Sequence, residues 1–281
     1  MAPPPGVSGV SLLNPGLPRR WLYGLTARRS DRAELRRLGL GMYVFLNFEH
    51  RLGVGCKVLV VDLDGTLTLS RNTYELSVEA LLALRRARDA GLRVVLATAN
   101  GLDFALTVAR YLGVRDVIAE NGCLVHVDGV TYELCSGDMS AVDRAVLATG
   151  AVEPSPQNKC RKYDLAYVPK AANAVELVRA AVGPGYVVES SGYAIHVRPA
   201  GVDKGTAVRW LCERFGVPCH QVAAVGDSDV DVGMLEVGWG IAVGNATPAA
   251  KRAARYVAEG PSGLGFKEAV ELILSGEACT P

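Results

Sequence analysis

Two carboxylates stand at the end of an apolar run in the first half of the chain. Residues 58–61 read Val-Leu-Val-Val, which is typical of a strand buried on both faces. Asp62 and Asp64 follow at once, and residues i and i+2 of an extended chain share one side, so both can enter one pocket. Paired carboxylates repel unless a proton or cation lies between them. The segment therefore predicts a divalent metal site, with Mg²⁺ as the usual ion. The alternative is a solvated Asp-Gly turn.

Two further apolar runs also end in polar residues. Residues 92–97 lead into Thr98, and residues 222–225 lead into a segment that contains Asp227 and Asp231. The carboxyl ends of parallel strands lie at one edge of a sheet, and open α/β sheets place their ligands at that edge. We therefore expect these side chains to converge on the first carboxylate pair.

Lys204 begins a predicted helix in the same half of the chain and can reach the same edge. Four acids, a hydroxyl and a lysine suit phosphoryl transfer, because the acids hold Mg²⁺ while the cations and the hydroxyl neutralise phosphoryl oxygens. In this chemistry Asp62 is the nucleophile that forms an aspartyl-phosphate. Asp64 is the general acid for the leaving alkoxide, and then the base that activates water.

Each of the later residues also has an ordinary structural interpretation. Thr98 is a suitable N-cap for the helix that follows it. Asp227 and Asp231 suit a solvated helix start that is stabilised by the helix dipole. Taken alone, Lys204 suits a solvated position in the first turn of its helix, but the order of the motifs favours a phosphate contact.

In type and order, these residues resemble the four motifs of the haloacid dehalogenase superfamily of phosphohydrolases. The matching segments are Asp62-Leu63-Asp64-Gly65-Thr66 for motif I, Thr98 for motif II, Lys204 for motif III, and Asp227 with Asp231 for motif IV. The resemblance implies that the four aspartates bind Mg²⁺, Asp64 through its backbone carbonyl, and that the threonine and the lysine bind the substrate. One departure is Val230, because many relatives carry Asn there.

The segment between motifs II and III resembles the cap of the type-2 subgroup, and Glu120-Asn121-Gly122 is typical of that subgroup. The compact cap and the spelling of motif I look most like archaeal phosphoglycolate phosphatases, which implies hydrolysis of 2-phosphoglycolate to glycolate and phosphate. His196 and Arg198, on the last strand of the cap, are candidates for binding a substrate carboxylate, since Arg suits bidentate contacts. The alternative for Arg198 is an ordinary position on a strand face.

Two other functions stay open at this point. A sugar-phosphate phosphatase of the sucrose-phosphate or mannosyl-phosphoglycerate type would keep the same chemistry with another cap specificity. A receiver-like module would bind phosphate without turnover, but such a module has no need for a general acid at Asp64.

The elements that must position these residues alternate along the chain. Strand and helix patterns follow one another up to residue 122 and again from Asp203, which predicts a parallel sheet with right-handed crossovers. Residues 123–134 suggest a hairpin with Asp-Gly at its turn. The fold class is thus α/β, a Rossmann-like parallel-sheet core with an inserted smaller α+β cap. We expect the core at 56–134 and 201–281, the cap at 135–200, and a poorly ordered or dispensable extension at 1–55.

Composition and charge narrow the function further. The 281-residue chain has a net charge of +1, and no apolar run approaches the ~20 residues of a spanning helix. We expect a cytoplasmic protein, a monomer or homodimer, with a small phosphorylated substrate and without nucleic-acid or membrane partners. Residues 1–55 carry eight Arg against three acids, so an RNA-binding arm is an alternative for that segment, as is a natural start farther along the chain.

The seven cysteines contain no C-x-x-C pair, so a zinc site is not expected. In a cytosolic setting most of them should be reduced and partly buried. The intracellular disulfides of thermophiles remain an alternative.

Overall fold

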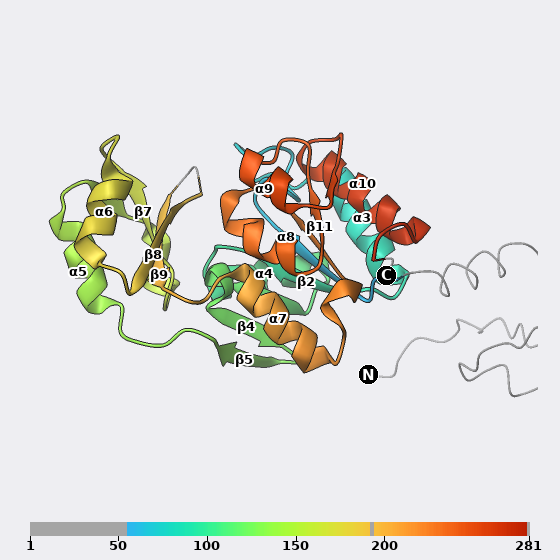
Figure 1. The fold of residues 1–281 in the computed structure, drawn as a ribbon, viewed down its shortest axis with the longest axis horizontal. Coiled ribbons are helices and arrows are strands. Elements are labelled where there is room, and N and C mark those ends of the chain that lie inside the picture. The colour runs from blue at the N-terminus through green and yellow to red at the C-terminus, as the bar shows by residue number, and fades with distance from the viewer. Residues whose placement is uncertain (1–54, 192–193, 280–281) are drawn as a thin grey trace, which may run out of the picture. The chain divides into compact units, whose positions relative to one another are not determined.

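The computed structural model of the chain describes residues 55–191 and 194–279. The extension expected at 1–55 lies outside the described residues, apart from Gly55. The described residues form two separate sheets, each with its own helices (Figure 1). None of the described helices combines the length and the apolar character that a membrane span requires.

The larger sheet has eight strands, in the order β12-β11-β10-β1-β2-β3-β4-β5. The strands from β12 to β3 are parallel, and β4 and β5 extend the sheet as an antiparallel hairpin. Their bounds are β1 Val58–Asp62, β2 Arg93–Ala97, β3 Asp116–Ala119, β4 Leu124–Val127, β5 Val130–Glu133, β10 Val222–Gly226, β11 Trp239–Ala242 and β12 Tyr256–Val257. β1 is completely buried and lies between β10 and β2, as its run of Val and Leu predicts.

Helices cover this sheet, and we call the sheet with these helices the core. They are α3 Val78–Asp89, α4 Leu102–Leu112, α7 Lys204–Phe215, α8 Val232–Val237, α9 Pro248–Ala253 and α10 Ser262–Ser275. Helix α3 packs against α10, and α7 packs against α8. Short 3₁₀ segments, η2 Glu120–Gly122, η4 Cys219–Gln221 and η5 Asp229–Asp231, join these elements.

The smaller sheet has four antiparallel strands in the order β6-β7-β9-β8. We call this sheet and its two helices the cap: α5 Ser140–Ala148, β6 Val152–Pro154, η3 Pro156–Cys160, β7 Leu165–Pro169, α6 Ala174–Val182, β8 Tyr186–Ser190 and β9 Ile195–Pro199. Val146 and Val178 of the helices pack with Tyr167, Ile195 and Val197 of the sheet in a hydrophobic cluster of its own. One face of the cap sheet is therefore covered by α5 and α6 (Figure 1).

The α/β fold class expected from the sequence is confirmed, and so are most of its elements. Helix α3 has Ser77 as its N-cap, and α4 ends at Gly113 in the left-handed conformation that favours glycine. The predicted hairpin turns at Asp128 and Gly129, both with positive φ, as a tight hairpin turn requires. The sequence pattern missed β6 and β12, because three and two residues are too short for a periodic signal.

The expectation that most cysteines are reduced is wrong. Six of them pair as Cys56–Cys279, Cys123–Cys135 and Cys212–Cys219, while Cys160 is free and exposed. The paired Cα atoms lie 4.8–5.5 Å apart, within the usual range for disulfides. Sequence spacing did not reveal the pairs, because the first joins residues that are 223 positions apart. The pairs agree with the alternative that the sequence left open, disulfides of the kind found in thermophiles.

The Cys56–Cys279 disulfide closes nearly the whole described chain into one loop, so it should stabilise the fold by restricting the unfolded state. Replacing both cysteines with serine should lower the free energy of unfolding by roughly 2–5 kcal/mol. Denaturant unfolding under non-reducing conditions measures this loss, and Cys160→Ser is the matched control. An unchanged unfolding midpoint in the double variant would contradict the prediction.

Candidate active site

Two neighbouring strands and a short 3₁₀ segment deliver the acidic side chains to one edge of the core sheet. β1 ends at Asp62, and Asp227 directly follows the end of β10 beside it, while Asp231 ends the short η5 segment. Asp62, Asp227 and Asp231 are buried, and each offers a carboxylate oxygen within 4.8 Å of those of the other two. The convergence expected from the sequence is thus present in the fold, and such a cluster requires positive charge nearby.

Lys204 supplies part of that charge. Its Nζ donates to Asp62 Oδ1 and to Asp231 Oδ1, both at 2.6 Å, and the ammonium is fully buried. Burial alone would lower the pKa of Lys204, but Asp231 and Asp62 raise it above its usual value, so the lysine stays charged. The lysine lies at the first position of α7, where the Asp203 side chain accepts from Thr206 N as the N-cap.

The two carboxylates that share Lys204 titrate differently. Burial, and next the charge of Asp231, raise the pKa of Asp62 well above its usual value, against the opposing effect of Lys204. Burial also acts to raise the pKa of Asp231, but Lys204 and the hydrogen bonds from Ser228 hold it below its usual value. Ser228 donates to Asp231 Oδ2 through both its N–H and its hydroxyl. Asp231 is therefore the stable anion of the pair.

Asp227 is held by an arginine from the loop after β1. Arg71 Nε donates to Asp227 Oδ2 at 2.8 Å, and its Nη2 contacts the same oxygen and the Asp227 carbonyl. Burial and the neighbouring Asp231 raise the pKa of Asp227 to about 6, although Arg71 opposes this shift. The other oxygen, Oδ1, is buried and accepts no hydrogen bond from any described residue. Gly65 has φ +90, and a Cβ there would lie 2.3 Å from Asp227 Oδ2, so only glycine fits beside this carboxylate.

These features suit a hard divalent cation. Three carboxylate oxygens converge, and the Oδ1 atom of Asp227 is left without a partner among the described residues. A buried carboxylate oxygen normally has a partner, and oxygen donors of this kind are the ligands that Mg²⁺ prefers. Asp62, Asp227 and Asp231 are thus the residues that could hold the ion. Arg71 contacts the Oδ2 atom of Asp227, so the unpartnered Oδ1 atom stays available to the ion.

Asp64 lies apart from the carboxylate cluster and has its own partner. Asn100 Nδ2 donates to Asp64 Oδ2 at 2.8 Å and to Thr98 Oγ1 at 3.0 Å. Burial raises the pKa of Asp64, while the hydrogen bond from Asn100 and the charge of Lys204 act in the opposite direction. A carboxyl group with a raised pKa retains a proton to higher pH, as a general acid requires.

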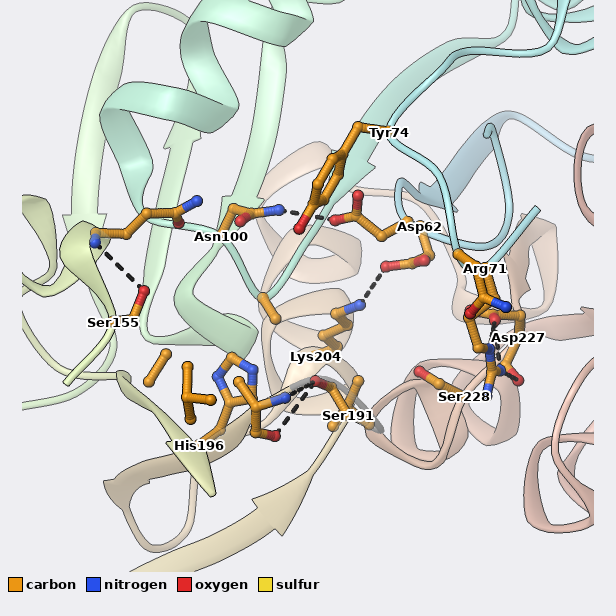
Figure 2. A pocket seen from close by; sticks show the side chains of 18 of the residues that line it. Asp62, Arg71, Tyr74, Asn100, Ser155, Ser191, His196, Lys204, Asp227 and Ser228 are labelled. Atoms are coloured by element: carbon orange, nitrogen blue, oxygen red, sulfur yellow. Dashed lines mark hydrogen bonds and ion pairs between the residues drawn. The ribbon is translucent and has the colours of Figure 1, made fainter. Parts of the chain in front are cut away.

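A cavity of about 290 Å³ connects these groups with the cap. Its core side includes Asp62, Asp64 and Lys204, and its cap side includes Arg161 and His196. Figure 2 shows the Lys204 side chain reaching toward Asp62, with Arg71 beside Asp227 and His196 across the cavity. Both carboxylates of motif I thus line the same cavity, as the spacing of the two residues suggested.

Two of the candidate residues are placed differently from the expectation. Thr98 is buried, and its Oγ1 accepts hydrogen bonds from the backbone N–H and the Nδ2 of Asn100. It is not among the residues that line the cavity. Arg198 is buried as well; it donates to Glu189 Oε2 at 2.8 Å and to the Val202 carbonyl at 3.0 Å, and does not line the cavity either. His196, two residues earlier on the same face of β9, lines the cavity.

Sequence reasoning missed Arg71, Asn100 and Arg161 as residues of the cavity. Arg71 is 156 positions away from its partner Asp227, so no local spacing reveals the contact. Asn100 could have been identified from the sequence as a cavity residue. It stands two residues after Thr98, just beyond the end of a strand that lies next to β1, which carries Asp62. Arg161 lies in the loop before β7 and donates to the Ala99 carbonyl, so it joins the cap to the core.

Residues 59–140 and 166–263 match the family of haloacid dehalogenase-like hydrolases. A phosphoglycolate phosphatase of Pyrobaculum aerophilum is 82% identical over 228 residues, which is 81% of this chain and 100% of that protein. The corresponding phosphoglycolate phosphatase of Pyrobaculum neutrophilum is 85% identical over the same shares of the two chains.

Solved structures share the fold at low sequence identity. A crystal structure of a Thermoplasma acidophilum protein superposes with a TM-score of 0.71 at 22% identity, covering 78% of this chain and 98% of that one. A haloacid dehalogenase-like hydrolase from Bacteroides thetaiotaomicron reaches a TM-score of 0.64 at 22% identity, covering 78% and 99%. These two likenesses support the arrangement of core and cap.

The Arg71–Asp227 contact generates a prediction about metal binding. Arg71→Lys keeps the positive charge but loses the planar fork that orients Asp227, so it isolates orientation from charge. Loss of such an orienting contact should weaken Mg²⁺ binding by about tenfold or more. Isothermal titration of the metal-free protein with Mg²⁺ measures the change, and Arg86→Lys, at an exposed ion pair, is the control. An unchanged dissociation constant in Arg71→Lys would show that Arg71 does not position the carboxylate.

A second prediction concerns the proton on Asp64. Replacing Asn100 with leucine removes the amide N–H that lowers the pKa of Asp64, so that pKa should rise further. Carboxyl NMR shifts followed through a pH titration of the metal-free protein report the change directly. If the titration of Asp64 stays where it is in the wild type, or moves to lower pH, the contact does not control the carboxyl group.

Proposed function

Because the chain belongs to the haloacid dehalogenase-like hydrolases, and is a phosphoric monoester hydrolase, we propose that it hydrolyses 2-phosphoglycolate to glycolate and phosphate. The reaction uses Mg²⁺ and passes through an aspartyl-phosphate on Asp62. One observation carries this proposal: Asp62 and Asp64 line one small cavity, the first paired with a buried lysine and the second able to hold a proton.

In the first half of the reaction, Asp62 attacks the phosphorus atom of the ester. The bond between phosphorus and the ester oxygen breaks, and its electron pair stays on the leaving oxygen, which takes the proton of Asp64. Lys204 favours the ionised form of Asp62 that this attack requires, because its ammonium lies 2.6 Å from Oδ1. Asn100 orients Asp64 toward the same cavity.

In the second half, Asp64 acts as the base. It removes a proton from water as the water oxygen attacks the phosphorus, the bond from phosphorus to Asp62 breaks, and inorganic phosphate leaves. The nucleophile and the acid are both restored by this step. Lys204 compensates the negative charge of the phosphoryl oxygens throughout, because it is preorganised and buried.

Asp62, Asp227, Asp231 and the backbone carbonyl of Asp64 are the proposed ligands of the cation. When bound, Mg²⁺ supplies positive charge that stabilises the phosphoryl oxygens. The convergence of three carboxylates, together with an Asp227 oxygen that has no partner among the described residues, supports this assignment.

The choice of substrate rests on the relatives and on the size of the cavity. The relatives that are 82% and 85% identical carry the name phosphoglycolate phosphatase. A cavity of about 290 Å³ lies at the lower end of the range for ligand pockets, which suits a small ester. Lys204 and the proton-holding Asp64 support turnover over a receiver-like role.

Replacing the nucleophile tests the mechanism. Asp62→Asn should lower kcat by at least about 10³-fold, because an amide cannot form the aspartyl-phosphate. Phosphate release from 2-phosphoglycolate with Mg²⁺ measures the effect, and circular dichroism checks the fold. Asp103→Asn, at an exposed position in the first turn of α4, is the matched control and should keep the wild-type rate.

Other outcomes of this assay revise the proposal in different ways. Wild-type turnover by Asp62→Asn would refute the nucleophile. Release from sugar phosphates alone would keep the mechanism and change the substrate. A folded wild-type protein that releases no phosphate from any ester would support the receiver-like alternative.

A further inference from the structure

We propose that His196, held in place by the buried Asp164, binds the carboxylate of the substrate as an imidazolium on the cap side of the cavity. This inference rests on the proposed function, because it concerns the end of the substrate that lies opposite the phosphoryl group. The inference assigns the recognition of a short phosphorylated acid to His196. The sequence alone could not decide between His196 and Arg198 for this role.

His196 is placed on the cavity side of β9 by the alternation of the strand. Ile195 and Val197 point into the hydrophobic cluster of the cap, so His196 and Arg198 lie on the opposite face. His196 lines the cavity, whereas Arg198 does not. Figure 2 shows the imidazole on the side of the cavity opposite Arg71 and Asp227.

Asp164 fixes the ring and determines which nitrogen faces the cavity. His196 Nδ1 lies 2.9 Å from Asp164 Oδ2, and Asp164 is completely buried. Burial would raise the pKa of Asp164, but His196, Arg161 and Arg198 together hold it below its usual value, so the carboxylate is ionised. An ionised carboxylate accepts a proton donor, so Nδ1 carries a proton. No described residue donates to or accepts from Nε2, which remains for the ligand.

The core holds Asp164 rigidly. Asn121 Nδ2 donates to Asp164 Oδ2 at 2.9 Å, and Glu120 accepts three backbone N–H groups from residues 162–164. Gly122 has φ +104, and a Cβ there would lie 2.1 Å from the Asp203 carbonyl, next to Lys204. The segment 120–122 therefore links the support of the histidine to the start of α7, which carries the lysine of the phosphoryl site. In this proposal, His196 and Lys204 bind the two ends of the substrate, and the segment 120–122 supports both of them.

The two arginines nearest His196 have protein partners. Arg161 Nη1 donates to the Ala99 and Asp164 carbonyls, and its Nη2 contacts Gln157 Oε1 at 3.3 Å, while its Nε is buried without a partner among the described residues. Arg198 is paired with Glu189. Ser191 exchanges hydrogen bonds with Ala194 rather than pointing a free hydroxyl at the cavity. Among the described cationic groups that line the cap side, His196 is the one with a ring nitrogen left for a ligand.

Charged groups of both signs surround the ring. Asp164 contacts it from the loop before β7, Arg161 lies 3.6 Å from the same carboxylate, and Glu189 is the register partner of His196 on β8. Glu189 is occupied by Arg198, so the imidazolium keeps one open donor, at Nε2. A carboxylate matches this donor with an opposite charge as well as a hydrogen bond, whereas a sugar hydroxyl offers the hydrogen bond alone.

A comparison of two substrates tests the proposal. 2-Phosphoglycolate carries the carboxylate, and 2-hydroxyethyl phosphate replaces it with a neutral alcohol of similar size. In His196→Gln, kcat/KM for 2-phosphoglycolate should fall about 10- to 100-fold, mainly through KM, while that for 2-hydroxyethyl phosphate changes less than about twofold. His126→Gln, on β4 outside the cavity, is the matched control and should leave both values unchanged.

A second variant and a binding measurement separate the possible failures. Asp164→Asn keeps the shape but removes the charge, and it should show the same selective loss if His196→Gln does not fold. Titration of 2-phosphoglycolate into Asp62→Asn, with and without His196→Gln, measures affinity without turnover. Equal losses for both substrates, or none, would overturn the role of His196 while leaving the phosphatase proposal intact. An inactive wild type that still needs His196 to bind 2-phosphoglycolate would refute the proposed function and support this inference.

Discussion

The contact of the Lys204 ammonium with Asp62 and Asp231 is the interaction on which the site depends. Three buried carboxylates at one sheet edge would repel one another strongly in a medium of low dielectric constant. Removing one member of such a buried set leaves an uncompensated charge, at a cost of about 3–5 kcal/mol. The lysine offsets part of this repulsion and leaves a net negative cluster. A net negative cluster with an unpartnered oxygen is suited to attract a divalent cation. The same charge arrangement that limits stability therefore prepares the site for phosphoryl chemistry.

The fold brings together side chains that lie far apart along the chain. Asp62 and Asp227 lie far apart in sequence, and the parallel pairing of β1 with β10 places them side by side at the ends of these strands. Lys204 joins them from the first position of α7. The cap then provides the opposite wall of the cavity from a separate sheet. Glu120 and Arg161 join the two parts through hydrogen bonds to backbone groups of the other part. The groups proposed to bind the phosphoryl end and those proposed to bind the rest of the substrate therefore come from two different sheets.

The sequence revealed the parts of the site that have local signals. Asp62 and Asp64 stand at the end of a strand that is readable from its β-branched residues, and Lys204 and Asp227 keep the order of known motifs. Arg71 and the cysteine pairs had no such signal, because their partners lie far away in the chain. The choice between His196 and Arg198 depended on which side chain lines the cavity, a tertiary property that strand periodicity does not contain. Short strands such as β12 were missed for a simpler reason, since two residues show no period.

The central claim is that Asp62 forms a covalent phosphoryl intermediate, and rapid quenching followed by mass spectrometry tests it most directly. Wild-type protein is mixed with 2-phosphoglycolate and Mg²⁺, quenched in acid within the first turnover, and digested. We predict a phosphoryl group on the peptide that contains Asp62, at a level that rises and falls with turnover. A peptide that stays unmodified at every time point while phosphate is released would contradict the account. It would show that water attacks the ester directly.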